Sequence, residues 1–84
     1  MCLARGQVIF TRHFLEELRN DTLTMQDVLT VCRTGVVVDP PEPDIRSGEW
    51  KYRIEGRTLD QDLVVVVFCF RAEDGAVFIT VFRR

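Results

Sequence analysis

Histidine and cysteine are scarce in this chain. His13 is the only histidine among 84 residues, and the three cysteines, Cys2, Cys32 and Cys69, show no C-x-x-C spacing. One histidine and scattered thiols do not supply the clustered ligands of a structural zinc site, and an odd number of cysteines is atypical of a disulfide framework. We therefore expect reduced thiols, no metal and no cofactor.

Long apolar segments and several well-known motifs are also missing. The longest apolar run, LVVVVFCF at residues 63–70, is far shorter than the ~20 residues with which a helix spans a bilayer. The N-terminal MCLARGQ lacks the apolar region of a secretory signal. There is no Gly-rich phosphate loop, no G-x-S-x-G and no H-E-x-x-H. These absences predict a cytoplasmic protein with no membrane partner.

The composition is that of one folded domain spanning residues 1–84. Hydrophobic residues make up 46% and charged residues 29% of the chain, which is typical of a soluble globular protein. The net charge of −2 does not by itself indicate a nucleic-acid-binding protein. Any basic surface must therefore be local.

Two short helices are predicted in the first half. Thr11 is a plausible N-cap for a helix over residues 12–20, in which Phe14, Leu15 and Leu18 form an apolar stripe. A second helix begins after Thr24, which forms a capping-box-like pair with Asp27. Its apolar stripe contains Met25, Val28, Leu29 and Cys32, and Gly35 is expected to end it in a left-handed conformation.

Strands are predicted around these helices. Residues 7–10 and 36–39 are candidate short strands, and PPEPD (40–44) is expected to be a stiff, exposed connector. Apolar and polar side chains alternate strictly over residues 50–57, which predicts a strand with one exposed face. Residues 63–70 are apolar on both faces and so predict a central strand. A turn at 73–75 then leads to a last strand over 76–82. The expected fold is α+β, with two N-terminal helices packed on one face of a small, mainly antiparallel sheet.

Two side chains are candidates for proton transfer. His13 could act as an acid or a base near neutral pH, and the Tyr52 hydroxyl could lie beside a phosphate. His13 lies on the shoulder of the first helix, where a structural alternative is a half-buried ring bonded to a carbonyl or to Glu17. Tyr52 shares a face with Trp50 and Ile54, where a buried aromatic with a satisfied hydroxyl is the commoner case. Both alternatives stay open.

A row of cations occupies the other face of the same strand. Lys51, Arg53 and Arg57 recur at period two, with Glu55 between them, and could follow a phosphate backbone or simply form a solvated face. RNA cleavage needs no protein-bound metal, because the 2′-hydroxyl of the substrate is the nucleophile and the protein need add only a base, an acid and cations.

The sequence resembles a family of small bacterial proteins of uncharacterised function. The resemblance is carried by Thr11, His13 and Arg19 in FTRHFLEELR, by Thr24 with "DVL" at 27–29, and by WKYRIEG, LVVVVFCF and AVFITVFRR in the second half. This family is similar to the RelE-like toxin superfamily, especially its MqsR and BrnT branches.

The resemblance implies a RelE/MqsR-like domain that is the toxin of a toxin–antitoxin pair and a metal-independent RNA endonuclease acting on mRNA. His13, Tyr52 and Arg83 are then the candidate catalytic residues, and Arg19, Lys51 and Arg53 the residues that bind RNA phosphate. Arg83 stands where MqsR-like toxins carry a lysine, which removes a proton donor but keeps a phosphate clamp. The expected partners are an antitoxin protein and RNA, and a homodimer is a further candidate.

Two other functions remain open. A non-catalytic protein-interaction module could use the same fold through its sheet surface or a strand edge. A DNA-binding regulator is a third candidate, although no recognition-helix pattern supports it.

Overall fold

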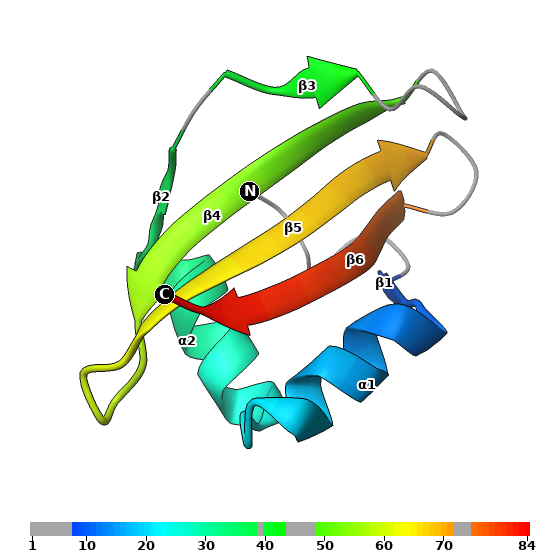
Figure 1. Cartoon of the computed structure of the whole chain (residues 1–84). Helices are drawn as coiled ribbons and strands as arrows, with labels where there is room; N and C mark the ends of the chain where they lie inside the picture. Colours follow the sequence, from blue (N-terminus) through cyan, green and yellow to red (C-terminus); the bar gives the residue numbers. More distant parts are fainter. Residues whose placement is uncertain (1–7, 39, 44–48, 72–74) are drawn as a thin grey trace.

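The computed structural model describes residues 8–38, 40–43, 49–71 and 75–84. Along the chain these residues form β1 (Val8–Phe10), α1 (Arg12–Asn20), α2 (Met25–Thr34), β2 (Val36–Val37), β3 (Glu42–Pro43), β4 (Trp50–Arg57), β5 (Leu63–Arg71) and β6 (Gly75–Arg83). Both helices lie on the same side of one twisted sheet (Figure 1). The predicted α+β fold is confirmed.

The sheet has the strand order β1-β6-β5-β4-β2, with β3 also paired to β4. β4, β5 and β6 are antiparallel neighbours, whereas β1 pairs with β6 in parallel, so the sheet is mixed. β5 is the central strand, as its two apolar faces predicted, and its residues Val64 and Val65 are at most 1% exposed. A bulge beside Val67 shifts the register between β5 and β6.

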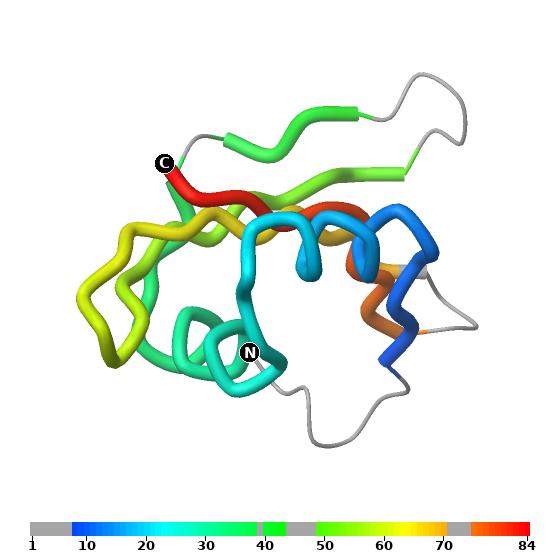
Figure 2. The backbone as a smooth tube through the Cα atoms, turned by 60° about the horizontal axis from the view of Figure 1, so that its bottom comes forward, coloured from blue at the N-terminus to red at the C-terminus, as the bar shows by residue number. Residues whose placement is uncertain are grey.

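The helix caps match those expected from the sequence. The Thr11 hydroxyl accepts a hydrogen bond from the Phe14 amide, and Thr24 and Asp27 form a complete capping box. α1 lies over β6 and α2 over β4 and β5, and the two helices are neighbours in front of the sheet in Figure 2. Their buried side chains, including Phe14 and Val28, join the core with the sheet's inner face.

The predicted left-handed conformation at Gly35 is wrong. Gly35 is extended, with φ −77° and ψ 177°. Glycine is required here by space rather than by φ: a Cβ would lie 2.5 Å from the Val31 carbonyl oxygen and 2.7 Å from the Glu55 carbonyl oxygen. The chain therefore passes directly from α2 into β2 while touching the backbone of β4.

Other boundaries differ in detail from those predicted. The segment 40–43, expected to be a connector, contains β3, in which Glu42 and Pro43 pair with Lys51 and Trp50. β2 is only Val36–Val37. Positions 7, 39, 44, 73 and 74 of the predicted strands, connector and turn lie outside the described residues. Gly75, which begins β6, has a φ of 76° that glycine adopts readily.

Candidate functional site

The two faces of β4 have different surroundings. Tyr52 and Ile54 point toward the helices, where Ile54 is 2% exposed in the core and Tyr52 packs against it. Because side chains alternate along a strand, Lys51 and Arg53 point to the far face of the sheet, which carries no helix in the described structure. The alternation read from the sequence thus places the predicted cations on a helix-free surface.

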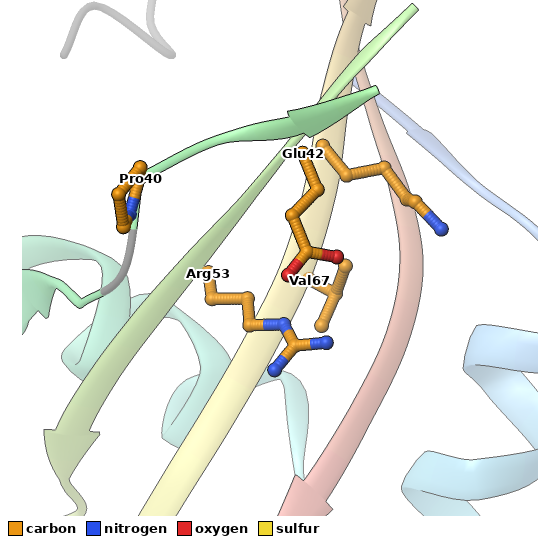
Figure 3. A pocket seen from close by; sticks show the side chains of 5 residues that line it. Pro40, Glu42, Arg53 and Val67 are labelled. Carbon is orange, nitrogen blue, oxygen red and sulfur yellow. The ribbon is translucent and has the colours of Figure 1, made fainter. Parts of the chain in front are cut away.

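Lys51 and Arg53 line a small hollow on this far face. The other lining residues are Pro40 and Glu42, from the segment containing β3, and Val67 from β5. In Figure 3 the Glu42 carboxylate and the Arg53 guanidinium point toward each other above the β-sheet. The cavity volume is about 30 Å³, which has room for an oxygen atom of a ligand but not for a nucleobase.

Farther along β4, the charged side chains of Glu55 and Arg57 contact residues of other segments. The Glu55 carboxylate pairs with Arg84, which follows β6, at 3.2 Å from Oε2 to Nε. Arg57 donates from Nη1 to the Gln61 carbonyl oxygen at 2.9 Å, within the loop that connects β4 to β5. Within this row, Lys51 and Arg53 share one concave space with a carboxylate, that of Glu42.

His13 and Arg19 lie elsewhere. Both are exposed side chains of α1, which packs on the opposite side of the sheet from the hollow. Tyr52 also faces the helix side, with its ring centroid 5.6 Å from that of Phe68 and 5.9 Å from that of Phe70. The sheet therefore separates these three side chains from Lys51 and Arg53.

Arg83 holds two loops against the end of β6. Its Nε donates to the Asp21 carbonyl oxygen at 2.8 Å and its Nη2 to Thr22 Oγ1 at 3.2 Å, while Nη1 forms an ion pair with Asp62. Its backbone amide donates to Asp21 Oδ2 at 3.1 Å. These bonds join the α1–α2 turn to the β4–β5 loop, and they give Arg83 a structural role beside the catalytic one predicted for it.

The structure thus brings together Lys51 and Arg53 from the predicted set and does not place His13, Tyr52, Arg19 or Arg83 with them. It adds one residue that sequence reasoning missed, Glu42. The available signal was an acidic residue held between prolines in PPEP, but only the pairing of β3 with β4 turns that residue toward the cations.

Comparison with models of protein families gives one match, over residues 10–83, to the family described as "Domain of unknown function (DUF4258)". The chain belongs to the DUF4258 family. The match extends from the end of β1 to the end of β6, and it confirms membership in an uncharacterised family. No curated protein and no solved structure matches the chain.

An apolar groove lies on the helix side of this DUF4258 domain. It has a volume of about 430 Å³ and is lined by residues of β1, α2 and β6: Val8, Phe10, Met25, Val28, Leu29, Cys32 and Phe78. The stripe predicted for the second helix therefore divides, with Val28 buried in the core and Leu29 half exposed at the groove. Burial raises the pKa of Cys32 to about 11, so its thiol is neutral at physiological pH.

Metal-ligating groups do not gather in the described parts of the DUF4258 chain: no three His, Cys, Asp or Glu side chains there could share an ion. The helices described, α1 and α2, are both too short to cross a membrane.

One further contact lies near the hollow on the far face. The thiol of Cys69, which is buried there, donates a hydrogen bond to Glu49 at 3.4 Å.

Proposed function

We propose that this DUF4258 chain is a RelE-like toxin that cleaves RNA without a metal ion, acts in the cytoplasm and is neutralised by an antitoxin protein. The observation that carries the proposal is the shared hollow of Lys51 and Arg53 on the helix-free face of the sheet. Two cations at period two on a strand can contact the phosphate backbone of an extended nucleic acid. Among the described elements no helix covers this face, so such a strand has access that the helix-covered face does not give.

The chemistry asked of these side chains is electrostatic. As the 2′-hydroxyl attacks phosphorus, negative charge develops on the phosphoryl oxygens, and cations fixed close to them lower the barrier. Arg53 offers a planar fork that binds two oxygens of one phosphate, and Lys51 adds a compact charge beside it. The hollow has room for one oxygen of that phosphate, and the rest of the group would lie outside it, above the sheet.

His13, Tyr52, Arg19 and Arg83 keep their predicted roles only as predictions. A straight RNA segment seated on the far face does not contact His13 or Tyr52, because the sheet lies between. A wrapped RNA strand would be needed to reach both sides. Substitutions of Lys51 and Arg53 on the far face and of His13 and Tyr52 on the helix side therefore test which face of the sheet cleaves RNA.

The test is cleavage of a defined RNA by the purified protein in excess EDTA, read at nucleotide resolution. We expect discrete cleavage by the wild type and a loss of about 100-fold or more with Lys51→Ala or Arg53→Ala, the scale of removing one transition-state donor. Arg33→Ala removes the same charge from an exposed position at the end of α2 and serves as the matched control. His13→Ala and Tyr52→Phe complete the set.

Each outcome has a definite meaning. Loss of cleavage with Lys51→Ala and Arg53→Ala supports the far-face site, and loss with only His13→Ala or Tyr52→Phe moves the reaction to the helix side. No cleavage by a folded wild-type protein would reject the nuclease and favour the protein-interaction module. Equal loss with Arg33→Ala would show that overall charge, not the hollow, binds the RNA.

A further inference from the structure

Glu42 stands directly beside the cationic pair because of the register of β3. Glu42 is the antiparallel partner of Lys51, and paired residues of neighbouring strands project to the same face of a sheet. Its side chain therefore shares the far face with Lys51 and Arg53, and Figure 3 shows its carboxylate directed at the Arg53 guanidinium. The hollow holds a proton acceptor as well as two cations.

The backbone that carries Glu42 is unusually restricted. All three prolines of the chain, Pro40, Pro41 and Pro43, flank it within four residues. Each proline fixes its own φ and limits the residue before it to extended conformations. The backbone at Glu42 is therefore held beside β4 by a stiff segment, which lowers the backbone entropy lost when a reacting group must be kept in place.

We propose that Glu42 is the general base of RNA cleavage at this hollow, an inference that rests on the proposed function. The Glu42 carboxylate takes the proton of the 2′-hydroxyl, and the 2′-oxygen forms a bond to the adjacent phosphorus. The bond from phosphorus to the 5′-oxygen breaks, and Lys51 gives that oxygen a proton. The products are a 2′,3′-cyclic phosphate and a 5′-hydroxyl, and solvent returns a proton to Lys51 and removes one from Glu42.

The surroundings of Glu42 suit this role. Among the described residues that line the hollow, the other charged side chains are Lys51 and Arg53, both from β4. The apolar Val67 of β5 lines the same hollow as Glu42. Cys69 lies two residues farther along β5, where it pairs with Lys51 of β4 and its thiol is hydrogen-bonded to Glu49. The two cations bind the phosphate, while the carboxylate repels it and has no use in phosphate binding alone. A role as the base gives the carboxylate in this cationic hollow a function in the reaction.

The experiment compares Glu42→Gln with the wild type by single-turnover cleavage of an RNA that the wild type cuts. We expect the rate to fall by about 100-fold or more, the usual contribution of general acid–base catalysis. Affinity for the same RNA with a 2′-deoxy nucleotide at the cut, which cannot react, should stay the same or increase. Glu16→Gln, on the exposed face of α1, is the matched control and should cleave like the wild type.

The outcomes separate this inference from the function on which it rests. A wild type that does not cleave RNA overturns the proposed function and the base together. A wild type that cleaves while Glu42→Gln cleaves as fast or faster overturns the base alone and makes Glu42 a competitor of the phosphate. A fall in both rate and affinity, with circular dichroism unchanged, also overturns it, because a base contributes to the reaction and not to binding.

Discussion

Gly35 and Gly56 lie backbone against backbone, where the end of α2 meets β4. A Cβ built on Gly56 would lie 2.9 Å from the Gly35 Cα and 3.3 Å from its nitrogen. Neither atom is the mobile end of a side chain, so the strain cannot be relieved by a change of rotamer. The two glycines therefore set how closely α2 approaches the sheet.

Alanine at position 56 should destabilise the fold. Overpacking of this kind costs about 1–3 kcal/mol, and Gly35→Ala should cost more because its Cβ would meet two carbonyl oxygens. Urea denaturation of the two variants measures both free energies of unfolding. A Gly56→Ala protein as stable as the wild type would show that α2 can move away from β4 without loss.

The two helix caps should differ in their contribution to stability. Both Thr11 and Thr24 accept a bond from their helix, but the Thr11 hydroxyl also donates to the Ile79 carbonyl oxygen of β6 at 3.1 Å. Loss of an N-cap lowers the free energy of unfolding by about 1 kcal/mol. We therefore expect Thr24→Ala to lower it by that amount and Thr11→Ala to lower it by more. Thermal unfolding of the pair is the measurement, and equal melting temperatures would contradict the added bond to β6.

Removal of the Arg83 side chain should loosen one end of the molecule. Its partners are exposed, so we expect a cost of about 1 kcal/mol for Arg83→Ala, or a Tm lower by about 4–8 °C for a domain of this size. Lysine should restore little, because one ammonium cannot reach Asp21, Thr22 and Asp62 as the guanidinium does. An unchanged Tm would contradict the structural role, and the RNA cleavage rate of the folded variant tests the predicted catalytic one.

The Cys32 thiol should react slowly in the folded protein. Its pKa is raised from 9.0 to about 11, and two pH units make the thiolate about 100-fold scarcer at pH 8. Peptide-mapped alkylation with iodoacetamide, with and without denaturant, measures the difference. Equal alkylation of the folded and the denatured protein would contradict the burial of Cys32.

The same pKa difference makes the free energy of unfolding depend on pH. Because the unfolded thiol ionises at the lower pKa, Cys32 contributes stability below pH 9 that is lost as the pH rises toward 11.

The elements that depend on local chemistry were predictable. Thr24 and Asp27 form the expected capping box because its hydrogen bonds join residues three apart. The alternation of residues 50–57 separated Lys51 and Arg53 from Tyr52 correctly, because side-chain direction follows from the strand itself. The double-sided apolar pattern of 63–70 likewise placed β5 at the centre of the sheet.

The features that depend on distant parts of the chain were not predictable in the same way. The conformation of Gly35 was mispredicted because the β4 backbone, about twenty residues later, decides it. Glu42 looked like part of a solvated connector, since its pairing with Lys51 leaves no periodic pattern in a two-residue strand. Arg83 could be predicted as a cation, but not as the partner of Asp21 and Asp62.

The parallel pairing of β1 with β6 has a consequence for the timing of folding. Val8 meets Ala76, and the Thr11 hydroxyl bonds a carbonyl 68 positions later. On the ribosome, α1 therefore has no sheet to rest on until β6 has been synthesised, while the valines of β5 are already made and uncovered. The β5 valines thus lack their β6 partner only during the last part of translation, and the core can close only when the last strand has been made.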